Sequence, residues 1–309
     1  MKPLFSVIIP TYNSASKITR AVKSVLAQTF KEYEIWVIDD GSTDETRGVL
    51  EPFGTQVHYH YQANQGVAGA RNQGARYASG AYLAFLDADD WWYPEKLERV
   101  AQAISAAPEV GLFYSQVDFF NEAGTKLWTY HSEDRGSRNY HTLLLRDFVL
   151  TSSAVAKTDC LTQMGRFDGS VSPCEDWDMW LRIAWRFPIR LIPEPLVAYE
   201  YQVTGSLTSG TQRWVQAHDR LLDKVMAADP DLTPPLWRRM RAAIAYRKGK
   251  IYLAAREDAS ALHAFQEALR LRPLFWESWL YWSVLKSRLL RKLLPQRIKY
   301  ALRLPEAQL

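Results

Sequence analysis

Short apolar runs alternate with amphipathic segments over the first third of the chain. The runs predict strands over residues 6–9, 34–38, 57–61 and 81–86. The amphipathic segments predict helices over residues 14–28, 66–78 and 94–106. Strands separated by helices of this length indicate βαβ units, so we expect a doubly wound α/β sheet.

The pattern is less regular in the middle of the chain and helical towards its end. Further strands are predicted over residues 111–120, 148–155 and 189–198, and a further helix over 177–185. From about Arg213 onward the pattern is helical, with prolines at 230, 234 and 235 as interruptions. We therefore predict an α/β domain with a mixed sheet over residues 1–210, in halves 1–107 and 108–210, and an all-helical appendage over 211–309.

Polar and acidic residues gather where the predicted strands of the first half end. They are Thr11-Tyr12-Asn13, Asp39-Asp40, Asn64 and Asp87-Ala88-Asp89. In open α/β sheets, ligands bind at the carboxyl ends of the strands. The sequence therefore predicts a binding site at this edge of the sheet.

The acids after the fourth strand suit a hard cation. Asp87 and Asp89 could offer carboxylate oxygens to Mg²⁺ or Mn²⁺ and leave coordination positions open for the phosphates of a nucleotide. The alternative is a solvated acidic turn that caps the next helix.

Two other segments suit a nucleotide. Asp40 could accept a hydrogen bond from a base N–H, and Tyr12 could stack on that base. Gly41 permits the tight turn after Asp40, so the turn itself needs no functional explanation. A helix that opens with small residues at Gly66 carries Arg71, which could reach the nucleotide or simply be an exposed arginine.

Glu175 and Asp176 stand at the start of the helix predicted over 177–185. Either carboxylate could take the proton of an attacking hydroxyl, and the helix dipole would keep it ionised. The alternative is a pair of acids that only stabilises the helix.

Composition excludes some classes of protein. The formal net charge of +4 is too small to indicate nucleic-acid binding, and two cysteines cannot build a disulfide framework or a zinc site. The sequence has no signal-peptide pattern and no apolar run of the ~20 residues that span a bilayer. We expect a cytoplasmic protein that is soluble or peripheral on the inner face of the plasma membrane.

Over roughly residues 4–210 the chain resembles the family 2 glycosyltransferases. The resemblance rests on five segments in the family's order and spacing: residues 6–13, 39–44, 64–72, 87–90 and 175–176. It implies the GT-A fold, with a nucleotide-sugar-binding half over 1–107 and an acceptor half over 108–210. It also implies transfer of a hexose, with inversion, from a nucleotide diphosphate sugar, often a UDP-sugar. The acceptor would be a carbohydrate or lipid-linked hydroxyl compound in the synthesis of a cell-surface polysaccharide or glycolipid.

Residue roles follow from the resemblance by position. Pro10, Tyr12 and Asp40 would belong to the nucleotide-sugar site, with Tyr12 and Asp40 on the base. Arg71 would support the nucleotide, and Asp87 would contact the ribose side.

The same resemblance assigns the chemistry. Asp89 would hold the divalent metal, and Asp176 would be the catalytic base. One departure stands out, because Glu200 and Gln202 occupy positions where many relatives carry arginine and histidine. The departure leaves open whether Gln202 replaces a metal or phosphate ligand.

The helical appendage carries two further patterns. Seven residues over 242–275 match the spacing of one tetratricopeptide-like repeat: Ala245, Gly249, Tyr252, Ala261, Phe265, Ala268 and Pro273. Residues 284–305 form a basic amphipathic tail, which suits an anionic membrane surface or a protein partner. A plain helical hairpin and a solvated basic helix are the alternatives.

Two other functions compete with glycosyl transfer. A nucleotidyltransferase would want a glycine-rich, lysine-bearing phosphate loop, which residues 10–16 lack. A non-catalytic scaffold acting through its helical end would have no need of Asp40, Asp89 and Asp176 together.

Overall fold

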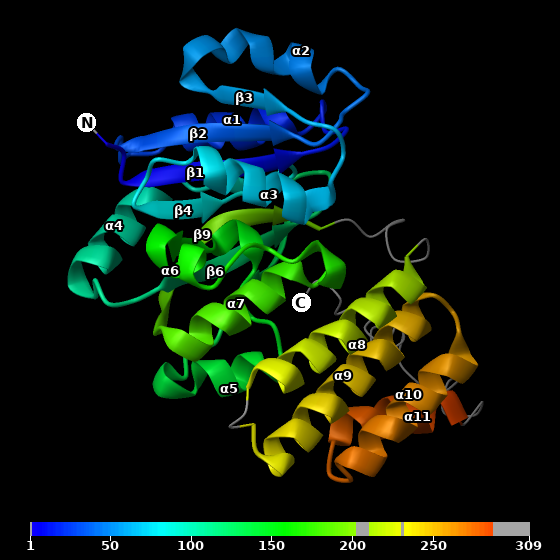
Figure 1. Ribbon diagram of the computed structural model, residues 1–309. Helices are drawn as coiled ribbons and strands as arrows, with labels where there is room; N and C mark the ends of the chain where they lie inside the picture. The colour runs from blue at the N-terminus through cyan, green and yellow to red at the C-terminus, as the bar shows by residue number, and fades with distance from the viewer. Residues whose placement is uncertain (1, 202–209, 230–231, 287–309) are drawn as a thin grey trace. The chain divides into compact units, whose positions relative to one another are not determined.

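The apolar runs of the first third form the parallel part of a nine-stranded mixed sheet (Figure 1). The computed structural model describes residues 2–201, 210–229 and 232–286. The strands are β1 (Phe5–Thr11), β2 (Tyr33–Asp39), β3 (His58–Tyr61), β4 (Tyr82–Phe85), β5 (Trp91–Trp92), β6 (Leu112–Phe120), β7 (Lys126–Tyr130), β8 (Val155–Lys157) and β9 (Ile189–Glu200). Their order is β3-β2-β1-β4-β8-β6-β9-β5, with β7 on β6. β1, β2, β3 and β4 pair in parallel, whereas β8 is antiparallel to both β4 and β6.

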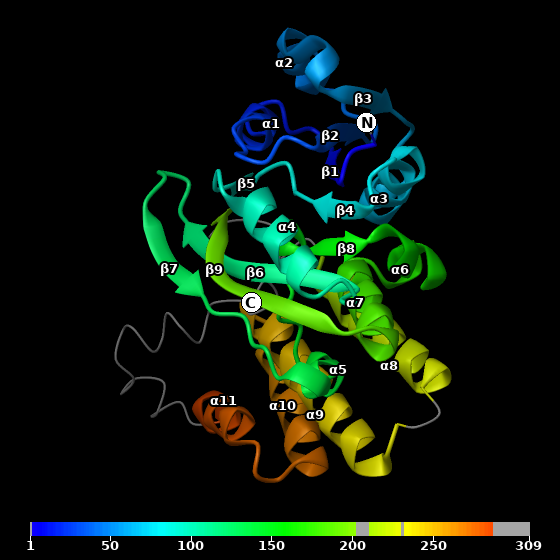
Figure 2. The same cartoon turned by 90° about the vertical axis from the view of Figure 1, so that its left-hand side faces the viewer.

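Helices cover both faces of this sheet. The helices up to residue 186 are α1 (Ile18–Leu26), α2 (Thr46–Leu50), α3 (Gly66–Tyr77), α4 (Lys96–Ala106), α5 (Asn139–Leu143), α6 (Thr158–Gln163) and α7 (Glu175–Arg186). Figures 1 and 2 show α3, α6 and α7 on one face and α1 on the other. Gly74 lets α3 lie close to the sheet, because a Cβ there would come within 2.5 Å of the Ile8 side chain. Helices on both faces and the mixed strand order confirm the predicted doubly wound α/β fold.

Two local predictions are wrong. The first helix begins at Ile18 rather than Ser14; the Ser14 N–H instead donates to Thr46 Oγ1, at the start of α2, at 3.0 Å. The strand predicted over 148–155 is mostly absent, since Thr151–Ser153 form a 3-10 turn, here η3, and pairing starts only at Val155. The turn is closed by the Ser153 N–H, which donates to the Leu150 carbonyl at 2.8 Å.

The chain divides into two units, and the second contains the predicted C-terminal helices. The first unit comprises Met1–Tyr140, Phe148–Gly169 and Glu175–Val203. The helices of the second are α8 (Thr211–Ala228), α9 (Pro234–Ala254), α10 (Asp258–Leu271) and α11 (Trp276–Lys286). Gly249 allows α9 and α10 to approach closely, because a Cβ there would lie 2.6 Å from the buried Phe265 ring. The domain boundary at residue 210 stays a prediction.

Some predictions fall on residues outside the described ranges. Gln202 is one of them, and the basic tail predicted over 284–305 lies almost entirely beyond residue 286. Within the described ranges, no helix has both the length and the apolar character that crossing a bilayer requires.

Candidate functional site

Asp40 lies buried at the carboxyl end of β2. Its Oδ1 accepts hydrogen bonds from Gln62 Nε2 at 2.7 Å and from the Gln65 N–H at 2.9 Å. Its Oδ2 accepts none from the described residues and so remains open to a ligand donor. The neighbouring Asp39 has a structural role, since its two oxygens accept from the Ser42 N–H and the Tyr59 hydroxyl.

The loop after β1 presents Tyr12 beside this strand end. β1 and β2 are paired up to Thr11 and Asp39, so Tyr12 and Asp40 follow adjacent strand ends. Tyr12 is 52% exposed, and Pro10 is buried within β1. The Asn13 amide oxygen holds the loop by accepting from the Thr43 N–H at 2.8 Å.

Arg71 in α3 bridges two acids that are far apart in the sequence. Its Nη2 donates to Asp87 Oδ1 at 2.9 Å, and its Nη1 donates to Glu175 Oε1 at 2.8 Å. The side chain is only 4% exposed. Burial disfavours the charged guanidinium, but the charges of Asp87 and Glu175 outweigh this effect and raise the pKa of Arg71. The reading of Arg71 as an exposed surface arginine is therefore wrong.

The acids after β4 form a partly buried group rather than a solvated turn. Asp90 is fully buried, and its carboxylate accepts from the Ser152 hydroxyl at 2.5 Å and from the Glu200 N–H at 3.2 Å. Burial and the charge of Asp87 raise the pKa of Asp89 to about 6, although Lys17 acts in the opposite direction. Burial raises the pKa of Asp90 well above its usual range, and the charge of Asp89 adds to the shift.

Asp176 and Glu175 share the start of α7 but differ in their surroundings. Glu175 is buried against Arg71, and its Oε2 has no partner among the described residues. Asp176 is half-buried; its Oδ2 accepts from the Thr151 hydroxyl at 2.6 Å and its Oδ1 from the Trp177 N–H at 2.7 Å. Burial and the charge of Glu175 raise the pKa of Asp176 to about 6.

The acids after β4 and Asp176 of α7 all influence the pKa of one side chain, Tyr199. Burial raises the pKa of the Tyr199 hydroxyl, and the charges of Asp90, Asp89, Asp87 and Asp176 raise it further. Arg71 also feels Asp87, Glu175 and Asp176 together. The structure therefore brings Asp87, Asp89 and Asp176 into one electrostatic neighbourhood. Asp40 accepts from the Gln65 N–H at the start of the helix that carries Arg71, but no interaction among the described residues joins it to Asp89 or Asp176.

Sequence patterns missed the turn η3 that supports these acids. Thr151 binds Asp176, Ser152 binds Asp90, and the Ser153 carbonyl accepts from the buried Lys96 ammonium at 3.0 Å. All three residues of η3 are buried. Three consecutive small hydroxyl residues in an apolar segment were the available signal, because buried hydroxyls need partners.

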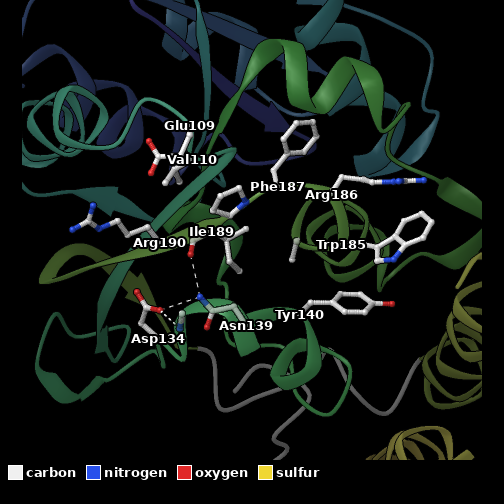
Figure 3. A pocket seen from close by; sticks show the side chains of 13 residues that line it. Glu109, Val110, Asp134, Asn139, Tyr140, Trp185, Arg186, Phe187, Ile189 and Arg190 are labelled. Atoms are coloured by element: carbon white, nitrogen blue, oxygen red, sulfur yellow. Dashed lines mark hydrogen bonds between the residues drawn. The ribbon is translucent and has the colours of Figure 1, made fainter. Parts of the chain in front are cut away.

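A separate hollow lies where β9 begins and α7 ends. It encloses about 560 Å³, and Figure 3 shows Trp185, Arg186, Tyr140, Glu109 and Arg190 around it. Predicted site residues are absent from its lining. It is therefore distinct from the acids described above.

The acids could hold a metal ion only with help from a ligand. Within the described ranges, no three His, Cys, Asp or Glu side chains are grouped so as to bind a metal by themselves. Asp87 and Asp89 nevertheless lie close enough for the charge of one to raise the pKa of the other. One or two carboxylates suit Mg²⁺ or Mn²⁺ when phosphates and water fill the other positions.

The family follows from a sequence profile. The profile of glycosyl transferase family 2 matches residues 6–161, which include β1 to β4 and the acids after β4. The chain belongs to glycosyl transferase family 2. The resemblance that the sequence motifs indicated is thereby confirmed at the level of the family.

Relatives match the family 2 part of the chain. An uncharacterized glycosyltransferase of Rickettsia typhi is 29% identical over 185 residues, which cover 58% of each protein. A Bacillus subtilis glycosyltransferase, TuaG, whose name assigns it to teichuronic acid biosynthesis, is 44% identical over 102 residues, or 32% of this chain and 40% of TuaG. The chain thus spans little more than half the length of the Rickettsia relative.

Solved structures share the fold at low identity. The Staphylococcus aureus protein TarS, in a fragment 1–349 bound to UDP-GlcNAc, has a TM-score of 0.63 at 18% identity, over 86% of this chain and 81% of the fragment. The Pyrobaculum calidifontis mannosyltransferase PcManGT, bound to GDP-Man and Mn²⁺, has a TM-score of 0.61 at 19% identity, over 94% and 83%. These likenesses support the glycosyltransferase fold of family 2.

Proposed function

We propose that the protein transfers a hexose from a nucleotide diphosphate sugar to a hydroxyl acceptor, with inversion and with a divalent metal. The observation that carries the proposal is the arrangement around Arg71. Four acids stand in two sequence pairs, Asp87 with Asp89 and Glu175 with Asp176. The buried Arg71 guanidinium bonds Asp87 in the first pair and Glu175 in the second. Among the described residues, the side chains of Asp89 and Asp176 accept no hydrogen bond from a cation. Both remaining acids have a pKa raised to about 6.

Asp176 is the base in this proposal. Its two oxygens are oriented by Thr151 and by the Trp177 N–H, so that the carboxylate has a fixed direction. A pKa near 6 makes it a stronger base than an ordinary aspartate while it stays ionised at neutral pH. It would take the proton of the acceptor hydroxyl as that oxygen attacks the anomeric carbon from the side opposite the diphosphate.

Asp89, with Asp87 beside it, would hold Mg²⁺ or Mn²⁺. Bound metal would supply positive charge for the leaving diphosphate. Oxygen donors, partial burial and mutual charge repulsion favour a cation here. PcManGT, which shares the fold, binds Mn²⁺ with GDP-Man, and this supports the proposal.

The donor base would lie against Tyr12 and Asp40. The open Asp40 Oδ2 would accept a base N–H, as uracil offers, and the exposed Tyr12 ring would stack on the base. Asp87 would face the ribose, and Pro10 would shape the strand end beneath. Arg71 would support the nucleotide indirectly, by fixing Asp87. A UDP-sugar is the proposed donor, and UDP-GlcNAc bound to TarS is consistent with it.

The acceptor would be a carbohydrate or lipid-linked intermediate of a cell-surface polysaccharide or glycolipid. The name of TuaG, which refers to a cell-wall polysaccharide, supports this class. The helical region after residue 210, read as one tetratricopeptide-like repeat and a basic tail, would bring the enzyme to a protein partner or to the inner face of the membrane. Close packing of α9 on α10 at Gly249 is consistent with such a repeat.

A donor screen tests the proposal. The full chain is incubated with UDP-, GDP- and TDP-sugars and Mn²⁺, and the released nucleoside diphosphate is measured. Activity with one donor, lost in both Asp89→Ala and Asp176→Asn, is expected. An unchanged rate in these variants would overturn the assignment, and a lack of any release or nucleotide binding would favour a non-catalytic scaffold.

A further inference from the structure

We propose that Lys17 binds the diphosphate of the sugar donor and that Glu200 holds it in place. This inference rests on the proposed function, because it assumes that a nucleotide diphosphate lies beside Asp89. Lys17 stands directly before α1, in the segment that follows β1 at the site edge of the sheet.

Glu200 gathers two cations at the end of β9. Its Oε1 lies 2.7 Å from Lys17 Nζ, and its Oε2 lies 2.5 Å from Arg20 Nη2. The Glu200 side chain is only 8% exposed. Burial alone would raise the pKa of Glu200, but the bonds from Lys17 and Arg20 outweigh burial and lower it. Glu200 is thus a fixed anion that keeps both cations next to the acids after β4.

Arg20 is occupied by the protein itself. The same Nη2 also donates to the Asp89 carbonyl at 2.7 Å, and the guanidinium lies over the Trp91 ring at 4.0 Å from its centre. Arg20 therefore connects α1, the loop of Asp89 and Glu200. We assign it a positioning role for that loop.

Lys17 is available to a ligand. Its ammonium carries three N–H donors, and among the described residues Glu200 is its one ion-pair partner. Its side chain is 29% exposed, against 8% for Glu200. It shares Glu200 with Arg20, which in turn bonds the Asp89 carbonyl at 2.7 Å, so the ammonium lies close to the loop of Asp89. A partly exposed ammonium that Glu200 holds near a proposed metal ligand suits a phosphate oxygen.

Charge balance favours such a cation. Asp87, Glu175 and Asp176 surround Arg71, which is therefore already neutralised by the protein. A metal at Asp89 would offset only part of the charge on a diphosphate. Lys17 is the cation that could take up more of it, since the N–H donors of Arg71 are bonded to acids and Arg20 bonds both Glu200 and the Asp89 carbonyl.

Binding measurements separate the diphosphate from the base. Isothermal titration would compare UDP with uridine, and GDP with guanosine, on the full chain with Mn²⁺ present. We expect Lys17→Met to weaken binding of the preferred diphosphate about 10- to 100-fold, as loss of a charged hydrogen bond does, and to leave nucleoside binding unchanged. Lys17→Arg keeps the charge and should recover most of the affinity.

Controls make the outcomes distinct. Lys23→Met removes an exposed lysine of the same helix and should change neither affinity. Should Lys17→Met fold poorly, Lys17→Gln gives the same readout. Wild-type affinity for the diphosphate in these Lys17 variants would overturn the inference and leave the proposed function standing. Failure of the wild-type chain to bind either diphosphate would overturn the proposed function and the inference together.

Discussion

Two acid pairs, Asp87 with Asp89 and Glu175 with Asp176, come from different halves of the sheet domain and share one cation. In each pair one member bonds Arg71 and the other does not. The bonded members are held in place by the Arg71 guanidinium, and the other two have a pKa raised to about 6. The difference teaches that a single arginine can divide four acids into two that it holds and two that it leaves for the proposed chemistry.

The largest expected effect is on kcat, from substitution of Asp176, the acid of the second pair that does not bond Arg71. Asp176→Asn should lower kcat by about 10²- to 10⁴-fold, the usual contribution of a general base. Glu175→Gln should cost much less, since its amide oxygen can still accept from Arg71. Initial rates of nucleoside diphosphate release measure both. Equal losses would show that the two acids do not differ in role.

The next effect is on stability. Arg71→Met leaves Asp87 and Glu175 without their shared partner and should lower the free energy of unfolding by about 3–5 kcal/mol. Arg76→Met, on the exposed side of the same helix, should have little effect. Urea denaturation measures both variants. The double variant Arg71→Met/Glu175→Gln should recover part of the loss, and no recovery would contradict the shared role.

A moderate effect is expected from pH. The proposed base Asp176 must be a carboxylate to take a proton, and burial raises its pKa to about 6. We therefore expect kcat to fall about tenfold per pH unit below 6 and to level off above it. Glu175→Gln removes a charge that raises this pKa, so its profile should shift to lower pH. Rates at saturating donor and Mn²⁺ from pH 4.5 to 8 give the profile. If the wild-type kcat fell only near pH 4, the usual pKa range of aspartate, the inference that burial and Glu175 raise the pKa of Asp176 would be contradicted.

The smallest effect concerns the support of Asp176. The Thr151 hydroxyl donates to this carboxylate and lowers its pKa, so Thr151→Val should shift the acidic fall of the kcat profile upward by less than about one pH unit. The rate at neutral pH should fall several-fold. Thr162→Val, whose hydroxyl only bonds the Thr158 carbonyl on the surface, is the matched control. If the acidic fall of the kcat profile kept its position in Thr151→Val, the Thr151 hydroxyl would have no influence on the pKa of Asp176.

The sequence predicted the first half of the sheet well because its signals are local. β1, β2 and β4 are short, largely apolar runs and β3 is a short aromatic run, and topology alone brings their carboxyl ends to one edge. Asp40 and the acids after β4 could therefore be located before any contact was known. The sequence analysis assigned the base to Asp40 rather than Asp39, but the contacts that separate the two acids, with Tyr59 and with Gln62, are visible only in the folded chain.

The second half depends on contacts that periodicity does not encode. The segment 148–155 reads as a strand, yet buried hydrogen bonds from Thr151 and Ser152 to acids far away in the chain favour a tight turn. The roles of Arg71 and Glu200 likewise depend on partners more than a hundred residues away. Pairings of this kind appear only when the chain is folded.

A crystal structure of the full chain with Mn²⁺ and a non-transferable UDP-sugar analogue tests the central claim most directly. We expect the diphosphate and metal at Asp89, with the Asp176 carboxylate on the opposite side of the anomeric carbon. A nucleotide bound elsewhere, for example in the hollow beside Arg190, or an anomeric carbon that faces away from Asp176, would contradict the account.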